Sequence, residues 1–73
     1  NINEKWDDYS ILDQKSGLTY TILRTEEYPQ QLMAVVDIEG RDVLIPLSDQ
    51  LITEIDKDQK IIHMEIPEGL LEL

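Results

Sequence analysis

The sequence has no cysteine and few basic residues, and these two shortages restrict its chemistry. Without cysteine the chain can form neither a disulfide nor a thiolate metal site, and its composition fits a cytoplasmic protein. Six Lys and Arg residues stand against sixteen Asp and Glu residues, which gives a formal net charge of −10. Phosphate backbones are bound through Lys and Arg, so this charge disfavours nucleic acid and suits a basic protein partner. A simpler alternative is that the charge only keeps the domain soluble.

The chain also lacks the residues that most active sites and metal sites need. Its single histidine, His63, falls on the polar face of a predicted strand, as an ordinary solvated side chain would. Three glycines leave little room for a phosphate-binding loop. The acidic run that starts at Asp56 has neither the glycine nor the glutamate of a calcium loop. We therefore predict no enzyme, no catalytic residue, no cofactor and no metal site.

Long apolar runs are absent as well. No stretch approaches the roughly 18 apolar residues of a membrane span, and the polar N-terminus has no signal-peptide core. With 73 residues the chain is at most one domain, and its core must be small. Because it begins at Asn1 rather than at Met, we expect it to be a piece of a longer protein.

Strand patterns dominate the residues that are present. Apolar residues alternate on both sides of Glu39–Gly40, which predicts a hairpin with a two-residue turn. In this register Val36 faces Val43 and Ala34 faces Ile45, so one face of the hairpin is apolar. A second, smaller set of apolar residues points the other way, and that face is expected to be covered in part; the set is Met33, Val35 and Leu44.

Other segments complete an all-β pattern. Strands are predicted over residues 9–13, 18–24, 51–56 and 60–66, with a loop over residues 25–30 and at most one short helical turn. Leu18 and Ile22 share one face of the second of these strands, and Ile62, Met64 and Ile66 share one face of the last. Six short strands at regular spacing indicate a small closed or nearly closed β-barrel, because closure removes the open edges of so small a sheet.

Three parts of the chain are candidates for protein binding. Trp6 and Tyr9 lie near the start and Tyr28 lies before Pro29; Trp and Tyr are frequent at interface hot spots. The third part is the apolar end of the chain with its acidic rim: Pro67, Glu68, Gly69, Leu70 and Leu71. Tyr9 and the leucines also have a structural alternative, since Tyr9 can pack in the core and the leucines can close one end of the barrel.

The second half of the chain follows a more specific pattern. An apolar strand after Gly40 runs into Ile45–Pro46, and Ile55–Asp56 and Pro67–Leu71 follow in order. This order and spacing resemble the C-terminal PRC-barrel domain of the ribosome maturation factor RimM. The resemblance covers most of the chain, roughly residues 16–73.

The resemblance implies a non-enzymatic, cytoplasmic assembly factor of the bacterial small ribosomal subunit. Residues 1–73 are then a single C-terminal PRC-barrel domain, with its N-terminal neighbour domain absent and residues 67–73 as a C-terminal tail. The family's partner is a basic protein of the small-subunit head, and the family assists late assembly and 16S rRNA processing. No direct nucleic-acid binding is expected from this domain. The alternative is a PRC-type barrel of an unrelated pathway that binds a small molecule or acts as an enzyme.

Overall fold

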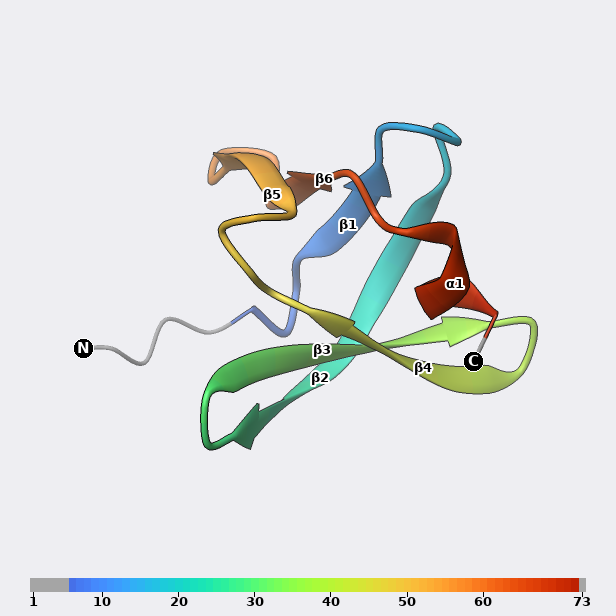
Figure 1. Cartoon of the computed structure of the whole chain (residues 1–73). Coiled ribbons are helices and arrows are strands. Elements are labelled where there is room, and N and C mark those ends of the chain that lie inside the picture. The colour runs from blue at the N-terminus through green and yellow to red at the C-terminus, as the bar shows by residue number, and fades with distance from the viewer. Residues whose placement is uncertain (1–5, 73) are drawn as a thin grey trace.

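The computed structural model describes residues 6–72, which form one six-stranded sheet curled around a core (Figure 1). The strands are β1 (Ser10–Asp13), β2 (Thr19–Tyr28), β3 (Gln31–Ile38), β4 (Arg41–Pro46), β5 (Ile52–Asp56) and β6 (Ile61–Met64), and the helix is α1 (Glu68–Leu71). The strand order is β4-β3-β2-β1-β6-β5. All neighbours are antiparallel except β1 and β6, which are parallel.

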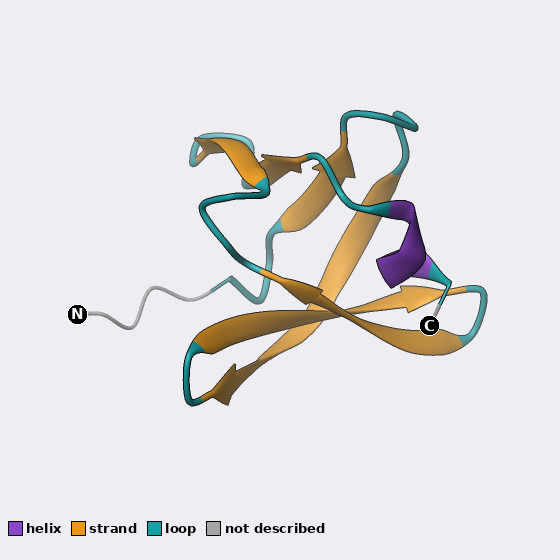
Figure 2. Ribbon diagram, viewed as in Figure 1, coloured by secondary structure: helices purple, strands orange, loops and turns teal. Residues whose placement is uncertain are grey.

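The predicted all-β architecture of six strands and one short helical turn is confirmed. The long strands β2, β3 and β4 form one twisted ribbon, and the shorter β1, β5 and β6 form a second group above it (Figure 2). The end strands β4 and β5 have no ladder between them in the described part of the chain, so hydrogen bonds do not close the barrel there.

The predicted hairpin is confirmed in its register. Val36 pairs with Val43 and Ala34 pairs with Ile45, and all four side chains are buried. At the tip, Glu39 has a φ of 54° and Gly40 a φ of 83°, as both central residues of a type I′ turn require. Glycine adopts this conformation at no steric cost, whereas Glu39 is strained by its Cβ atom.

Replacing Glu39 by asparagine is therefore expected to stabilise the fold by about 0.5–1 kcal/mol, because asparagine tolerates the left-handed region better than glutamate does. Urea unfolding followed by far-UV circular dichroism measures the change. Glu39→Gln is the matched control, since it removes the same charge and keeps the strained geometry. An equal gain from both variants would mean that relief of charge repulsion, and not backbone geometry, stabilises the turn.

The core fills the space inside the curled sheet. Its members are 5% exposed or less: Tyr9, Ile11, Ile22, Ala34, Val36, Val43, Ile45, Ile62, Met64 and Ile66. The last three confirm the face that alternation predicted for the final strand. Aliphatic side chains make up nearly all of this set, so the interior is an apolar core.

Two details of the second strand differ from the prediction. Residues 25–28 do not form a loop, because β2 continues to Tyr28 and the turn is limited to Pro29 and Gln30. The continuation pairs with β3, so tertiary hydrogen bonding outweighs the low strand propensity of adjacent glutamates. Leu18, expected on the same face as Ile22, is instead 57% exposed in the turn before the strand.

A buried carboxylate connects the first turn to the end of the chain. Asp13 is 2% exposed, the one buried charged side chain among residues 6–72. Its Oδ2 accepts a 2.9 Å hydrogen bond from the Ser16 hydroxyl, and its Oδ1 accepts from the backbone N–H groups of Lys15 and Ile66, at 3.3 Å each. Ile66 lies 53 residues further along the chain, so Asp13 fixes the position from which Pro67 and α1 start.

Candidate protein-binding surface

The two aromatic residues near the start of the chain pack against each other. Trp6 and Tyr9 make an edge-to-face contact, with ring centroids 4.8 Å apart and an interplanar angle of 71°. Tyr9 is 5% exposed and belongs to the core, while Trp6 is half-buried against it. Tyr9 therefore packs in the core, which was the structural alternative to a binding role. Trp6 presents only part of its ring to solvent.

An ion pair lies beside these rings. The Lys60 ammonium is 2.7 Å from Oδ2 of Asp8 and 6.0 Å from the centroid of the Tyr9 ring. The hydrogen bond from Lys60 lowers the pKa of the Asp8 carboxyl, and the same bond raises the pKa of Lys60. Both groups are at the surface, so the pair orients the first turn and contributes little stability.

The residues of the predicted C-terminal binding group divide between core and surface. Leu70 and Leu71 are partly buried and pack against the core. Pro67, Glu68 and Gly69 are exposed. The guanidinium of Arg41 donates a 3.1 Å hydrogen bond to the carbonyl oxygen of Leu71, which attaches α1 to the start of β4. The leucines thus cap one end of the molecule, and the acidic and small residues before them face solvent.

Tyr28 lies on a different surface, the side of the β2–β3–β4 ribbon that faces away from the core. We call this side the outer face, and its members follow from the strand register: Arg24, Glu26 and Tyr28 from β2, Met33, Val35 and Asp37 from β3, and Asp42 and Leu44 from β4. Tyr28 is 45% exposed there. Of the predicted binding residues, it is the one that the structure places on this surface.

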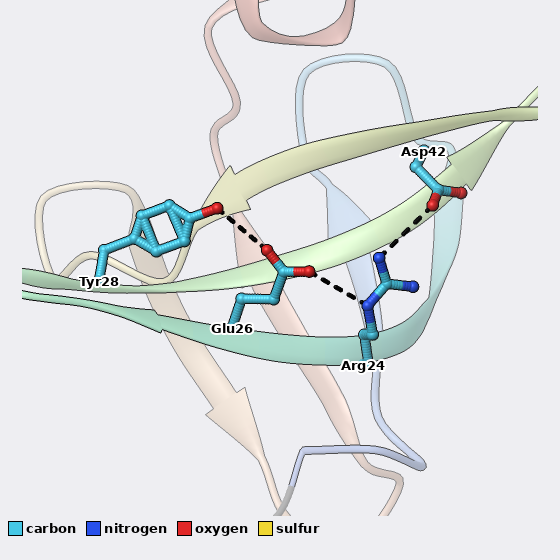
Figure 3. Close-up of polar contacts among 4 residues, drawn as sticks. All are labelled: Arg24, Glu26, Tyr28 and Asp42. Carbon is cyan, nitrogen blue, oxygen red and sulfur yellow. Dashed lines mark hydrogen bonds and ion pairs between the residues drawn. The ribbon is translucent and has the colours of Figure 1, made fainter.

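Four polar side chains of the outer face form a continuous chain of contacts (Figure 3). The Tyr28 hydroxyl donates a 3.0 Å hydrogen bond to Oε1 of Glu26, and Nε of Arg24 donates a 3.2 Å hydrogen bond to Oε2 of Glu26. Nη2 of Arg24 then lies 3.6 Å from Oδ2 of Asp42. The hydrogen bond to the Glu26 carboxylate raises the pKa of the Tyr28 phenol, because ionisation would remove the donated proton; the negative charge of Glu26 raises it further.

Apolar side chains lie between these polar groups. Val35 is 1% exposed although it is outside the core cluster, and Leu44, its partner on β4, is 37% exposed. On the β2 side, Val35 has Arg24 as its cross-strand partner. Because the guanidinium of Arg24 reaches Asp42 on β4, the Arg24 side chain passes over β3. Surface side chains, and not another element of the fold, therefore cover this valine.

Most of the outer face was not predicted from the sequence. Tyr28 and the apolar set on the second face of the hairpin were predicted, but Arg24, Glu26 and Asp42 were not. The available signal was the spacing of two between Arg24, Glu26 and Tyr28, which places all three on one side of an extended strand. The prediction of a loop over residues 25–30 concealed that spacing.

Metal-ligating clusters and membrane-spanning helices are two other features that could indicate a function. No group of three or more metal-ligating side chains occurs within residues 6–72. In the same part of the chain, no helix has the length and apolar character needed to cross a membrane. Two exposed surfaces of the described residues are thus candidates for protein binding: the outer face and the exposed start of α1.

Comparison with known proteins gives one consistent result. Residues 9–70 match a family described as the RimM PRC barrel domain. Proteins named "Ribosome maturation factor RimM" are similar to this chain: 33% identical over 90% of the chain in Azobacteroides pseudotrichonymphae, 32% over 93% in Parabacteroides distasonis and 34% over 93% in Bacteroides fragilis. These alignments cover 40%, 41% and 39% of those relatives, so the chain spans about two fifths of their length. No significant match was found among solved structures.

Proposed function

Because the chain belongs to the RimM PRC barrel domain family, we propose that it is the docking domain of a ribosome maturation factor and binds a basic protein of the small-subunit head. The family is bacterial and cytoplasmic, and it is a family of maturation factors and not of enzymes. Help in late small-subunit assembly and in 16S rRNA processing then follows from docking.

The observation that carries the proposal is the acidic charge of a domain whose core is almost entirely aliphatic. A net charge of −10 attracts and steers a basic protein. The same charge repels an RNA backbone, so contact with the subunit through a protein is favoured over direct contact through rRNA. Because the alignments cover about two fifths of the relatives' length, we further propose that an N-terminal domain precedes residues 1–73 in the whole protein and that residues 67–73 act as the C-terminal tail.

The alternative of a small-molecule or enzymatic barrel has less support. Such a site needs a cavity with convergent polar groups. Inside this sheet the side chains are almost all aliphatic and at most 5% exposed. The buried carboxylate of Asp13 is already hydrogen-bonded to Ser16 and to two backbone N–H groups.

Titration calorimetry tests the proposed docking. The 73-residue chain is titrated with each basic protein of the small-subunit head, purified separately, at about 50 mM and about 200 mM salt. We expect one of these proteins to bind, and we expect the affinity to fall several-fold at the higher salt because the attraction between surface charges is screened. Failure of every head protein to bind at either salt contradicts the proposal. Binding that does not change with salt contradicts the role given to the acidic charge.

A further inference from the structure

The outer face is a sheet surface that no described element covers. It is formed by the three long strands of the ribbon, and α1 lies against β4 at the end where the core is capped (Figure 1). Tyr28 is 45% exposed, Leu44 is 37% exposed and the Arg24 side chain is 53% exposed. A surface that combines an aromatic residue, an arginine and aliphatic side chains has the composition of an interface centre.

Its apolar centre is already partly desolvated. Val35 is 1% exposed because neighbouring side chains cover it, and Met33 and Leu44 flank it on the same face. The stem of Arg24 contributes to this cover, since it passes from β2 over β3 to Asp42 on β4. A partner that moved Arg24 aside would gain contact with a preformed apolar surface.

The ion pairs that hold Arg24 are weak ones. Its partners Glu26 and Asp42 have side chains 36% and 59% exposed, and pairs in such positions contribute about 0–1 kcal/mol. Asp37 pairs with Asp42 across the hairpin and adds a third carboxylate to this face, against the single guanidinium of Arg24. The face is therefore acidic. Because the ion pairs of Glu26 and Asp42 with Arg24 are weak, a cation of a partner can compete for these carboxylates.

We propose that a basic segment of the protein partner docks on the outer face, with apolar side chains on Met33, Val35 and Leu44 and with an arginine or lysine that replaces Arg24 at Glu26 and Asp42. Arg24 is then an internal stand-in for the partner's cation. This assignment rests on the proposed function, and it names the surface and the exchange that docking uses. Tyr28 stays beside the site through its hydrogen bond to Glu26.

Other occupants fit the same surface less well. A second copy of the chain in a symmetric dimer would bring two acidic faces together, and like charges across an interface oppose association. A nucleic acid would bring phosphates to three carboxylates and one arginine, which is the wrong charge balance. A basic protein segment complements both the charge and the apolar centre.

The apolar half of the proposal is tested by Leu44→Gln, with Ile55→Gln as matched control. Leu44 and Ile55 have the same exposed fraction, 37%, and they lie on the two end strands of the sheet, β4 and β5. Neither substitution changes the charge. We expect Leu44→Gln to weaken binding of the basic head protein about tenfold and Ile55→Gln to leave it within about twofold, as measured by calorimetry. Thermal melts of both variants check that they fold.

The exchange is tested by Arg24→Gln, with Arg24→Lys as control. Removing the internal cation leaves Glu26 and Asp42 free for the partner, so Arg24→Gln is expected to tighten binding about three- to tenfold and to steepen its salt dependence. Arg24→Lys keeps the charge but has a single ammonium in place of the two guanidinium nitrogens that contact Glu26 and Asp42, so it is expected to tighten binding less than Arg24→Gln does. Weaker binding by Arg24→Gln overturns the exchange, because Arg24 would then contact the partner itself.

The results of these binding experiments distinguish the proposed surface from the proposed function on which it rests. If the parent chain binds a head protein and both Leu44→Gln and Arg24→Gln bind as the parent does, the outer face is excluded and the proposed function stands. If the parent binds no head protein while small ribosomal subunits retain it equally in all variants, the basic-protein partner and this surface are both overturned. Loss of binding in Leu44→Gln alone, in a variant that melts like Ile55→Gln, supports the surface.

Discussion

Replacing Asp13 by alanine is expected to lower the free energy of unfolding by about 3 kcal/mol, because it removes a buried acceptor from three donors. The Ile66 N–H group is buried and loses its carboxylate partner, and Ser16 loses a 2.9 Å hydrogen bond. An unpaired buried donor costs about 1–3 kcal/mol, and hydrogen bonds to a charged group contribute more than neutral ones. The substitution is therefore expected to destabilise both the first turn and the end of the chain.

The expected loss is a large share of the total free energy of unfolding. A domain of 73 residues is stable by about 4–11 kcal/mol, at the usual contribution per residue. For a chain of this size, 3 kcal/mol corresponds to a fall in melting temperature of about 12–24 °C. Thermal and urea unfolding, followed by far-UV circular dichroism, measure both quantities.

Two milder variants separate the local from the long-range part of this effect. Asp13→Asn keeps an oxygen that can accept from Ile66, so it is expected to lose less than half as much stability. Ser16→Ala removes only the local hydrogen bond and is expected to cost about 1 kcal/mol. If Asp13→Ala melts within a few degrees of the parent, the contact with Ile66 does not hold the end of the chain in place.

Local patterns predicted those elements whose pairing partners are close in sequence. The β3–β4 hairpin followed from the alternation of Ala34, Val36, Val43 and Ile45 around Glu39–Gly40, and the structure has that register. The buried face of β6 followed in the same way. In each case a period of two, set against a polar opposite face, leaves one register that buries the apolar side chains.

Contacts between distant segments were not predictable in this way. Asp13 reads as an ordinary turn residue, and nothing near it reveals the hydrogen bond from Ile66. The charged stretch that continues β2 reads as a loop, because its strand character depends on pairing with β3 and on the side-chain contacts of Arg24, Glu26 and Tyr28. A bulge between Ile22 and Arg24 then decides which side of the sheet these residues face.

The candidate site was predictable only in part for the same reason. Tyr28 was identified by residue type, yet its surface is defined by β4, which contributes Asp42 and Leu44. Leu70 and Leu71 were identified by their apolar character, which does not distinguish a cap from an interface. Only the packing of these leucines against the core separates the two roles.

Removing residues 70–73 is expected to destabilise the domain by about 2–3 kcal/mol, because it exposes the core that Leu70 and Leu71 partly cover. The fully buried side chain of a leucine contributes about 1.5–3 kcal/mol, and these two are half-buried. The truncation also removes the carbonyl of Leu71 that accepts a hydrogen bond from Arg41. Urea unfolding of the truncated and parent chains measures the loss.

A shorter truncation, of residues 72 and 73 only, is the control, because it keeps both leucines that pack on the core. If the two truncated chains unfold alike, the leucines are not a cap. Binding by the longer truncation, measured at a temperature where it is still folded, then decides the second role. Unchanged affinity assigns the leucines to the core and leaves docking to the outer face, whereas loss of affinity in a folded chain gives Pro67–Leu71 the binding role proposed for them.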